Sequence, residues 1–433
     1  MKSISKWVFI TLLAIFFSTS NAQDLAIGLS DLLARADSGS TALRASRAGI
    51  SVSRETLENT RRSTLLPEVT FSASLGYLGN GYGWGRDSNY SFTVPMPHIS
   101  TRFGVDVQQV IYAGGAARAA RRQAELGVRL SELGYGHQRQ ELRLQLAGLY
   151  MDLYRAVRQL EVYDSNIALT RRLIGDIRAR HEQGTALKND LTRYELQLAT
   201  LQMQRTRVEN DLAIANSQIV TLAGLSQSTR VIPDSSFLAA KPDLFSNSNS
   251  LSSTLPVQMA EAKADLAGQQ LKQSRSAMLP YLALVAQDQL NGPVTIDITP
   301  YNINYNYWFV GLSLNYNLSS LWKSNPAVRT ARFNREQALL ERQAVEEQTR
   351  QELGAAAIRL DEARRNLTIK QKSMQLAAQN YALVADRYTN ELALLVDMID
   401  AANQKLAAEL DMVSARIEVV YRGYVIDYIN GKL

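Results

Sequence analysis

Apolar side chains recur every seven residues along the segment from Leu353 to Ala401. The first row of this pattern consists of Leu353, Leu360, Leu367, Met374, Tyr381 and Tyr388. A second row, three positions further on, consists of Ala356, Ala363, Ala377 and Val384. Two rows with this spacing are the a and d positions of a coiled coil, and the alanines let a partner helix approach closely. We therefore predict a tightly packed antiparallel helical hairpin with its tip near residue 391.

The same pattern occurs a second time, 207 positions earlier in the chain. One row consists of Leu146, Leu153, Leu160, Ile167, Ile174 and His181, and the other of Leu149, Ala156, Tyr163, Thr170 and Ile177. Such a repeat predicts an internal duplication of one long helical unit. We place the first repeat at 23–227, with a hairpin tip near Gly184, and the second at 255–433. Residues 228–254 contain prolines and the run SNSNSLSST and are predicted to be a connector.

Each repeat changes from helix to strand at a Leu-Pro pair. We expect helix from Leu25 to Leu66 with a break at residues 37–40, and Pro67 ends it because proline lacks an amide hydrogen and disfavours helix before it. Pro280 has the same position in the second repeat. Beyond each proline, apolar residues alternate with small polar ones, as in β-strands. Strands are predicted at about 68–78, 102–112, 281–290 and 307–318, and a loop at 79–100.

The N-terminus predicts export from the cytoplasm. Lys2 and Lys6 precede and flank an apolar run that extends from Trp7 to Phe17, and small polar residues lead to Ala22. This order indicates a signal peptide at residues 1–22. The run is too short to cross a bilayer, which takes roughly 20 residues. No later segment resembles a transmembrane helix, so any membrane crossing should use the strands.

The predicted strands have the alternation that a membrane β-barrel needs, with lipid on one side and water on the other. Four strands per chain are too few to close a barrel, because known single-chain barrels begin at about eight strands. We therefore expect an oligomer, and the strand count leaves two or three copies open. Aromatic residues near strand ends suit the membrane interfaces. The predicted interface residues are Tyr77, Trp84 and Trp308 near one rim, and Tyr112 and Trp322 near the other.

Composition excludes several classes of function. The formal charge of +6 is spread over 433 residues with both signs interleaved, which does not indicate nucleic-acid binding. The chain has no cysteine, so disulfides, thiolate metal sites and a lipid-modified N-terminal cysteine are excluded. Its histidines, His98, His137 and His181, lie far apart and outside any metal-binding motif. We predict a protein that is not an enzyme, with no metal site and no cofactor.

The whole mature chain resembles the TolC-like outer-membrane efflux family. The resemblance rests on the two helix-Leu-Pro-strand junctions, the strand-to-helix passage QQVIYAGGAARAA, and the tips ARHEQGTALKND and ADRYTNELALLVDMIDA. It implies a mainly α fold with a membrane β-barrel, built from a duplicated helix-strand-strand-helix unit. Three chains would form a 12-stranded barrel in the outer membrane of a Gram-negative envelope, above an α-helical coiled-coil tunnel in the periplasm. The connector would be equatorial.

The resemblance also implies a function and partners. The protein would be a passive exit duct of tripartite efflux or type I secretion, opened by a periplasmic adaptor and an energised inner-membrane transporter. Drugs, metal ions and polypeptides are all cargoes of such ducts, and the residues do not select among them. A periplasmic adaptor-like hairpin protein without a pore is the alternative. A soluble periplasmic monomer would favour the adaptor, and an SDS-resistant trimer in outer-membrane fractions would favour the duct.

The tip residues are the predicted functional site. By resemblance, the gate residues are Tyr388, Asp397 and Asp400, while a basic gate residue of the family pattern falls on Ala393. Three copies of Asp397 around a narrow axis would repel one another and favour cations. Asp397 could equally cap the return helix, as Asp190 could in the first repeat. The tip turns, which are also the predicted adaptor contacts, are Gly184, Asp190, Asn390 and Glu391.

Overall fold

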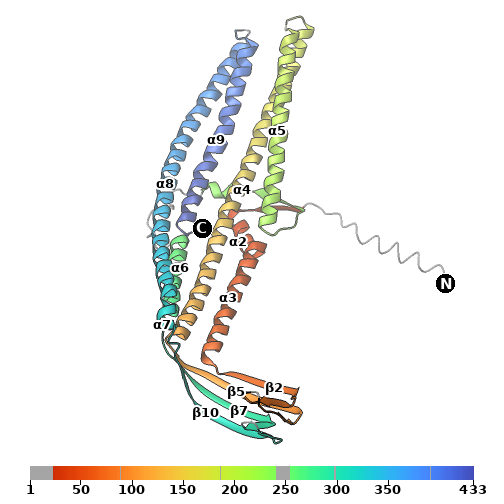
Figure 1. Cartoon of the computed structure of the whole chain (residues 1–433). Coiled ribbons are helices and arrows are strands. Elements are labelled where there is room, and N and C mark those ends of the chain that lie inside the picture. Colours follow the sequence, from red (N-terminus) through yellow and green to blue (C-terminus); the bar gives the residue numbers. More distant parts are fainter. Residues whose placement is uncertain (1–22, 88, 186, 240–253, 297–298, 391) are drawn as a thin grey trace, which may run out of the picture. The chain divides into compact units, whose positions relative to one another are not determined.

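The computed structural model describes residues 23–87, 89–185, 187–239, 254–296, 299–390 and 392–433 (Figure 1). The predicted signal peptide, Glu391 and residues 240–253 of the connector lie outside the described residues. The chain divides into two compact units. Unit 1 comprises Met1–Arg47, Gly134–Val257 and Glu346–Leu433, and unit 2 comprises Ala48–Leu133 and Gln258–Val345. Each unit therefore takes segments from both predicted repeats.

Unit 2 contains a four-stranded antiparallel sheet. Its strands are β2 (Glu68–Tyr77), β5 (Ile99–Ala113), β7 (Tyr281–Gly292) and β10 (Tyr305–Asn315). Their order is β10-β7-β5-β2, so the middle strands, β5 and β7, join the two repeats by pairing Thr101 with Gly292 and Ala113 with Tyr281. Within the described residues, β2 pairs only with β5 and β10 only with β7. The sheet therefore has two open edges.

The helices of unit 2 stop where the Leu-Pro pairs predict. Helix α3 (Thr41–Leu65) ends just before Pro67, and α6 (Leu255–Ser276) ends shortly before Pro280. Strands β2 and β7 begin directly after these prolines. The fourth strand is shorter than predicted, because β10 ends at Asn315 and the chain turns into the short helix α7 (Ser320–Lys323). That turn is closed by the Ser320 N–H donating to the Asn317 carbonyl at 2.9 Å.

The prediction of a loop at 79–100 was wrong in part. A hairpin lies within it, in which β3 (Gly81–Trp84) pairs with β4 (Ser91–Val94). Glycine leaves room at Gly83 for the ring of Phe92, since a Cβ there would lie 2.7 Å from that ring and would force it to move. Glycines at alternate positions hide the apolar alternation by which strands are recognised. A second short hairpin pairs β8 (Val294–Ile296) with β9 (Thr299–Tyr301).

Two antiparallel helical hairpins form most of unit 1 (Figure 1). Helix α4 (Ala116–Glu182) begins in unit 2 and ends in unit 1, where α5 (Lys188–Leu222) returns along it; α8 (Asn325–Thr389) and α9 (Leu395–Ile429) are the second pair. In each hairpin, an ion pair joins the two helices. Arg205 on α5 contacts Asp164 on α4 at 2.6 Å, and Lys370 on α8 contacts Asp411 on α9 at 2.6 Å.

The predicted seams differ in how well one chain covers them. In the first hairpin the seam is buried almost to its tip, at Leu146, Leu153, Ala156, Tyr163, Ile167, Thr170, Ile174 and Ile177. In the second, Ala356, Leu360 and Ala363 are buried, but Met374 is exposed. His181, a predicted seam residue, is also exposed. The part of the α8–α9 seam around Met374, nearer the tip, is therefore left uncovered within a single chain.

The start of the first predicted helix was wrong. Residues from Leu25 belong to β1 (Gln23–Ile27), which pairs in parallel with β6 (Thr229–Pro233), and helix α2 (Leu29–Gly39) begins only afterwards. A five-residue strand offers too little alternation to separate it from the end of a helix, and its partner lies far away in the sequence. The predicted connector thus contributes a strand, followed by a short 3-10 helix, η1 (Ser236–Ala239).

Tyr150 joins these elements at the centre of the largest hydrophobic core of unit 1. Its side chain is fully buried, and its ring meets the edge of Phe237 at a centroid distance of 5.7 Å. The hydroxyl donates to the Ile27 carbonyl at 2.8 Å and accepts from the Asp234 N–H at 2.8 Å. Burial raises the pKa of Tyr150 far above its ordinary value, so the hydroxyl stays protonated and able to donate.

Replacing Tyr150 with phenylalanine should lower the free energy of unfolding by about 2 kcal/mol, because the buried Ile27 carbonyl and the partly buried Asp234 N–H lose their partner. Denaturant unfolding followed by circular dichroism measures this change. Tyr77→Phe is the matched control, since the Tyr77 side chain is exposed and its substitution should change stability by less than about 0.5 kcal/mol. Equal effects of the two substitutions would contradict a structural role for the Tyr150 hydroxyl.

Candidate functional site

The α4–α5 tip is a tight turn organised by glycine. Helix α4 ends at Glu182, and Gly184 has φ +76, a conformation that side chains rarely adopt. The Thr185 N–H then donates to the Arg180 carbonyl at 2.9 Å, which is the long-range bond of a Schellman cap. Helix α5 begins at Lys188, and Asp190 lies in its first turn with its N–H bonded to the Leu187 carbonyl.

The α8–α9 tip repeats this geometry 207 residues later. The Leu392 N–H donates to the Arg387 carbonyl at 2.8 Å, the counterpart of the bond between Thr185 and Arg180. Asn390 extends the end of α8, because its side-chain nitrogen donates to the Asp386 carbonyl at 2.9 Å. Both turns present a leucine to solvent directly before the return helix, with Leu187 70% and Leu394 71% exposed.

Asp397 has a clear structural contact at this tip. Its carboxylate accepts from the Leu394 N–H at 3.2 Å, which satisfies one of the free amides at the start of α9. The structure therefore supplies the capping contact that was one of the two predicted roles of Asp397. Asp400 lies one turn on and accepts from the Gln404 side chain at 2.8 Å. Both carboxylates are exposed in the single chain.

Tyr388 lies where the two hairpins of one chain meet. It packs against a small buried cluster formed by Ile174, Ile177, Tyr194 and Leu395. The Arg180 guanidinium carbon lies 5.8 Å from the centre of the Tyr388 ring, within the range of a cation–π interaction. Burial raises the pKa of Tyr388, and the charge of Arg180 opposes this only in part. The ring therefore ties α8 to α4 through both apolar and electrostatic contacts.

Arg180 was missed by the sequence analysis, although a pattern could have revealed it. Arg180 and Arg387 are 207 residues apart and end equivalent helices. Comparison of the repeats would have shown an arginine next to the seam position at each tip. The hydrogen bond of 2.6 Å from Gln197 on α5 to Asn403 on α9 is a second contact between the hairpins that periodicity did not predict.

The predicted membrane-interface residues are spread over several elements of unit 2. Tyr77 ends β2 and stacks on His98 with centroids 5.0 Å apart, while Tyr112 lies near the opposite end of β5. Trp308 is the fourth residue of β10. Trp84 lies in the β3–β4 hairpin and Trp322 in α7, so neither belongs to the four-stranded sheet.

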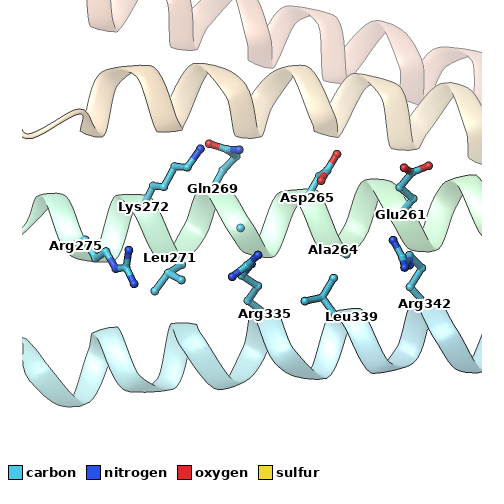
Figure 2. Close-up of a pocket in the computed structure, with 11 residues that line it drawn as sticks. Glu261, Ala264, Asp265, Gln269, Leu271, Lys272, Arg275, Arg335, Leu339 and Arg342 are labelled. Carbon is cyan, nitrogen blue, oxygen red and sulfur yellow. The ribbon is translucent and has the colours of Figure 1, made fainter.

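A groove of about 390 Å³ lies between α6 and α8 in unit 2, and Figure 2 shows the side chains that line it. Its charged lining residues are Glu261, Asp265, Lys272, Arg275, Arg335 and Arg342. The two acidic residues lie at one end and Lys272 with Arg275 at the other (Figure 2). Because both signs are present, the groove has no single-sign field that would concentrate one kind of ion.

Two kinds of structure are absent from the described residues. These residues contain no cluster of three or more His, Cys, Asp or Glu residues that could hold a metal ion. No described helix combines the length and the apolar character needed to cross a bilayer. The described residues do contain a duplicated pair of helical hairpins and a four-stranded sheet with two open edges.

The comparisons with known proteins define the class as an outer membrane efflux channel. The chain belongs to the outer membrane efflux protein family, whose model matches residues 32–225 and 248–420. It is 22% identical over 416 residues to the outer membrane efflux protein BepC of Brucella suis, covering 94% of this chain and 85% of BepC. The protein is thus an outer membrane efflux duct, a class of channel rather than of enzyme.

Solved structures agree on the fold. The outer-membrane channel OprN superposes with a TM-score of 0.77 at 19% identity, covering 93% of this chain and 89% of OprN. The outer membrane protein VceC of Vibrio cholerae superposes with a TM-score of 0.76 at 14% identity, covering 93% and 96%. The resemblance to TolC-like channels inferred from the sequence is therefore confirmed.

Proposed function

We propose that the protein assembles as a homotrimer into the exit duct of a tripartite efflux or type I secretion system. The observation that carries this proposal is the open sheet, whose edges β2 and β10 both leave backbone groups unpaired within the described chain. In a bilayer such groups must be paired, and closure into a barrel is the one way for strands to achieve this. Three copies of a four-stranded sheet would give 12 strands, within the range of known barrels.

The side chains of the edge strands support contact with lipid. Val69, Phe71 and Leu75 alternate along β2 and are all exposed, and Val310, Leu312 and Leu314 do the same on β10. Alternate residues of a strand lie on one face, so each edge strand has one apolar face. We place Tyr77, Trp84, Tyr112, Trp308 and Trp322 at the membrane–water interfaces, which aromatic side chains favour.

The rest of the proposed assembly follows the order of the chain. Residues 1–22 would be removed on export. The hairpins would form a coiled-coil tunnel in the periplasm, with the connector at its equator. The tip turns at Gly184, Asp190, Asn390 and Glu391 would meet a periplasmic adaptor coupled to an inner-membrane transporter, with the exposed Leu187 and Leu394 as apolar contacts.

The proposal is tested by isolating the full-length protein from outer-membrane fractions. We expect an SDS-resistant trimer that separates into monomers on heating and that forms pores of low conductance in planar bilayers. A soluble periplasmic monomer without pore activity would contradict the proposal and revive the adaptor-like alternative. The family match does not favour that alternative.

We further propose that Tyr388, Asp397 and Asp400 restrict the pore at the tip. Changing both Asp397 and Asp400 to asparagine should raise single-channel conductance and lower cation selectivity, because a ring of negative charge at a constriction would be removed. Asparagine keeps an oxygen that can accept from the Leu394 N–H, so the cap of α9 is preserved. Unchanged conductance and selectivity would leave Asp397 with its capping role alone.

A further inference from the structure

The four-stranded sheet of unit 2 has one apolar and one polar face. Residues that pair directly across neighbouring strands lie on the same face, so the strand registers assign each residue to a face. One row across the sheet consists of Val69 on β2, Val107 on β5, Ala286 on β7 and Val310 on β10. The adjacent row, on the opposite face, consists of Thr70, Asp106, Gln287 and Phe309. In the proposed barrel the first face would meet lipid and the second would line the interior.

The polar face carries aromatic residues on one strand, β10. Its next two rows, further from the helices, consist of Ser72, Gly104, Gln289 and Tyr307, and of Ser74, Arg102, Asn291 and Tyr305. On β2, β5 and β7, every residue of these three rows is small, an amide or charged. On β10 all three are aromatic, and we call Tyr305, Tyr307 and Phe309 the aromatic ladder.

The rings of the aromatic ladder follow one another along β10. The ring centroids of Tyr305 and Tyr307 are 6.0 Å apart, with 30° between the ring planes. The Tyr307 hydroxyl donates to the side-chain oxygen of Gln289 at 2.8 Å, which fixes the ring over the sheet. The Phe309 ring extends over Gly311, where a Cβ would lie 2.5 Å from the ring. The polar face therefore presents a continuous strip of aromatic surface.

Neither membrane anchoring nor core packing explains the aromatic ladder. Trp308 lies between Tyr307 and Phe309 in the sequence, and its side chain is on the opposite, apolar face. Interfacial aromatic side chains face lipid, so Trp308 suits that role and the ladder does not. The ladder side chains are between 37% and 54% exposed, so no described element covers them. These rings are free to contact a ligand.

The proposed assembly would also leave the aromatic ladder uncovered. Strand β10 is an edge of the sheet, and in a closed barrel it would pair with β2 of the next copy. A large side chain at that joint would cover the rings. The residues that β2 places on the polar face beyond Glu68 are Thr70, Ser72, Ser74 and Gly76. They are all small, so one side of each ladder would remain open.

The chemistry of the aromatic ladder favours flat π systems. Aromatic rings stack on other planar rings, and exposed aromatic side chains bind nucleobases in this way whatever the base. Three rings in a row offer more surface than one planar ring fills. Asp106 and Arg102 lie two strands away, about 10 Å across the sheet, and have opposite charges. These charges select neither sign, so ring stacking is the feature that distinguishes ligands here.

We infer that the aromatic ladder is a binding site for planar aromatic molecules on the inner wall of the duct. The inference rests on the proposed function, which makes the polar face the inner wall. The ladder is at the end of the sheet away from the helices, so it would contact cargo on the last part of its path. It narrows the cargo from drugs, metal ions and polypeptides to molecules that carry a flat aromatic system.

Fluorescence polarisation of proflavine, a planar aromatic dye, tests this site on full-length protein in detergent. Wild-type SDS-resistant trimers should bind proflavine saturably, above the level that empty micelles take up. Acridine, which is planar and uncharged, should displace it, and tetraethylammonium, which is charged and has no ring, should not. Replacing Tyr305, Tyr307 and Phe309 together with leucine should weaken binding by about tenfold or more, because apolar volume is kept and the stacking surface is lost.

Matched variants separate the rings from other effects. Tyr305→Phe combined with Tyr307→Phe keeps every ring and should bind like the wild type. Tyr307→Leu alone should weaken binding, whereas Trp308→Leu, the adjacent residue on the opposite face, should leave it unchanged. This pair of single substitutions decides the question even if the triple leucine variant does not assemble.

The failures of the site and of the duct are distinguishable. Wild-type trimers that take up no more proflavine than empty micelles would overturn the inferred site and leave the duct intact. The same holds if Tyr307→Leu and Trp308→Leu have equal effects, or if tetraethylammonium displaces proflavine as well as acridine does. A wild-type protein that forms no SDS-resistant oligomer would overturn the proposed duct, and with it the inner wall that the inference requires.

Discussion

Replacing Tyr388 with leucine is expected to increase the open fraction of the channel in planar bilayers by about tenfold. The substitution removes the ring on which Arg180 lies and part of the packing against Tyr194 and Leu395. These contacts together are worth about 1.4 kcal/mol, which corresponds to a factor of ten in an equilibrium ratio. Single-channel recording measures the change as longer openings or a higher conductance level.

Further substitutions show whether the effect comes from the Tyr388 ring, from its hydroxyl, or from the loss of any nearby charge. Tyr388→Phe keeps both the ring and the cation–π contact and should behave like the wild type. Arg180→Gln should open the channel, and combining it with Tyr388→Leu should add little, because both substitutions remove the same contact. Arg178→Gln is the matched control, since Arg178 lies on the same helix and pairs with exposed Glu195 at 3.4 Å.

The contact between Arg180 and Tyr388 lies at the tip, where the sequence of this chain departs from the family pattern. The resemblance expects a basic gate residue at position 393, where this chain has an alanine, which carries no charge for an ionic contact. Arg180 brings a positive charge to Tyr388 from α4 instead. Wild-type gating in Arg180→Gln, together with opening in Arg178→Gln, would show that Arg180 does not have this role.

Asp37→Ala is expected to destabilise unit 1 by about 2 kcal/mol near neutral pH. Asp37 lies at the end of α2 and accepts hydrogen bonds from two arginines of α4. Arg139 donates at 2.8 Å, and Arg143 binds both carboxylate oxygens. The carboxylate is mostly buried, so its removal would leave two neighbouring guanidinium groups without their shared counter-charge. Thermal unfolding of detergent-solubilised protein measures the loss.

The contacts of Asp37 should also make the stability of unit 1 depend on pH. Partial burial opposes ionisation of Asp37, but the hydrogen bonds and charges of Arg139 and Arg143 outweigh it and lower the pKa of the carboxyl. The stabilisation is therefore present above the unfolded-state pKa of about 3.9 and is lost as the pH falls through the lower folded-state value. Asp37→Asn should flatten the acid limb of the stability profile. Glu132→Gln, which breaks the exposed pair with Arg54, should leave it unchanged.

Periodicity predicted the parts of the fold that depend on one face of a long element. The heptad rows of α4 and α8 extend over many turns, so an apolar face stands out, and the Leu-Pro pairs mark helix ends by steric exclusion rather than by preference. The four strands of the sheet lie close to their predicted positions for the same reason, since each alternates over about ten residues.

Short and long-range features escaped prediction. The pairing of β1 with β6 joins five-residue segments across most of the first repeat, and neither has enough residues to establish a period. The small polar residues at 37–40 predict a turn. They do not reveal that the Asp37 carboxylate accepts hydrogen bonds from arginines more than 100 residues away. Arg180 lies off the seam and acquires its partner only where the hairpins meet. Periodicity within one element cannot reveal contacts of this kind.

The duplicated tips illustrate a consequence of joining two repeats in one polypeptide. A ring made from identical single hairpins would have the same contact between every pair of neighbouring hairpins. Any mutation would then change all of these contacts together. Here Tyr388 corresponds to His181 and Asn403 corresponds to Leu196, so equivalent positions of the two repeats hold different residues. In the proposed ring, the contact between the two hairpins of one chain and the contact between neighbouring chains can therefore differ from each other.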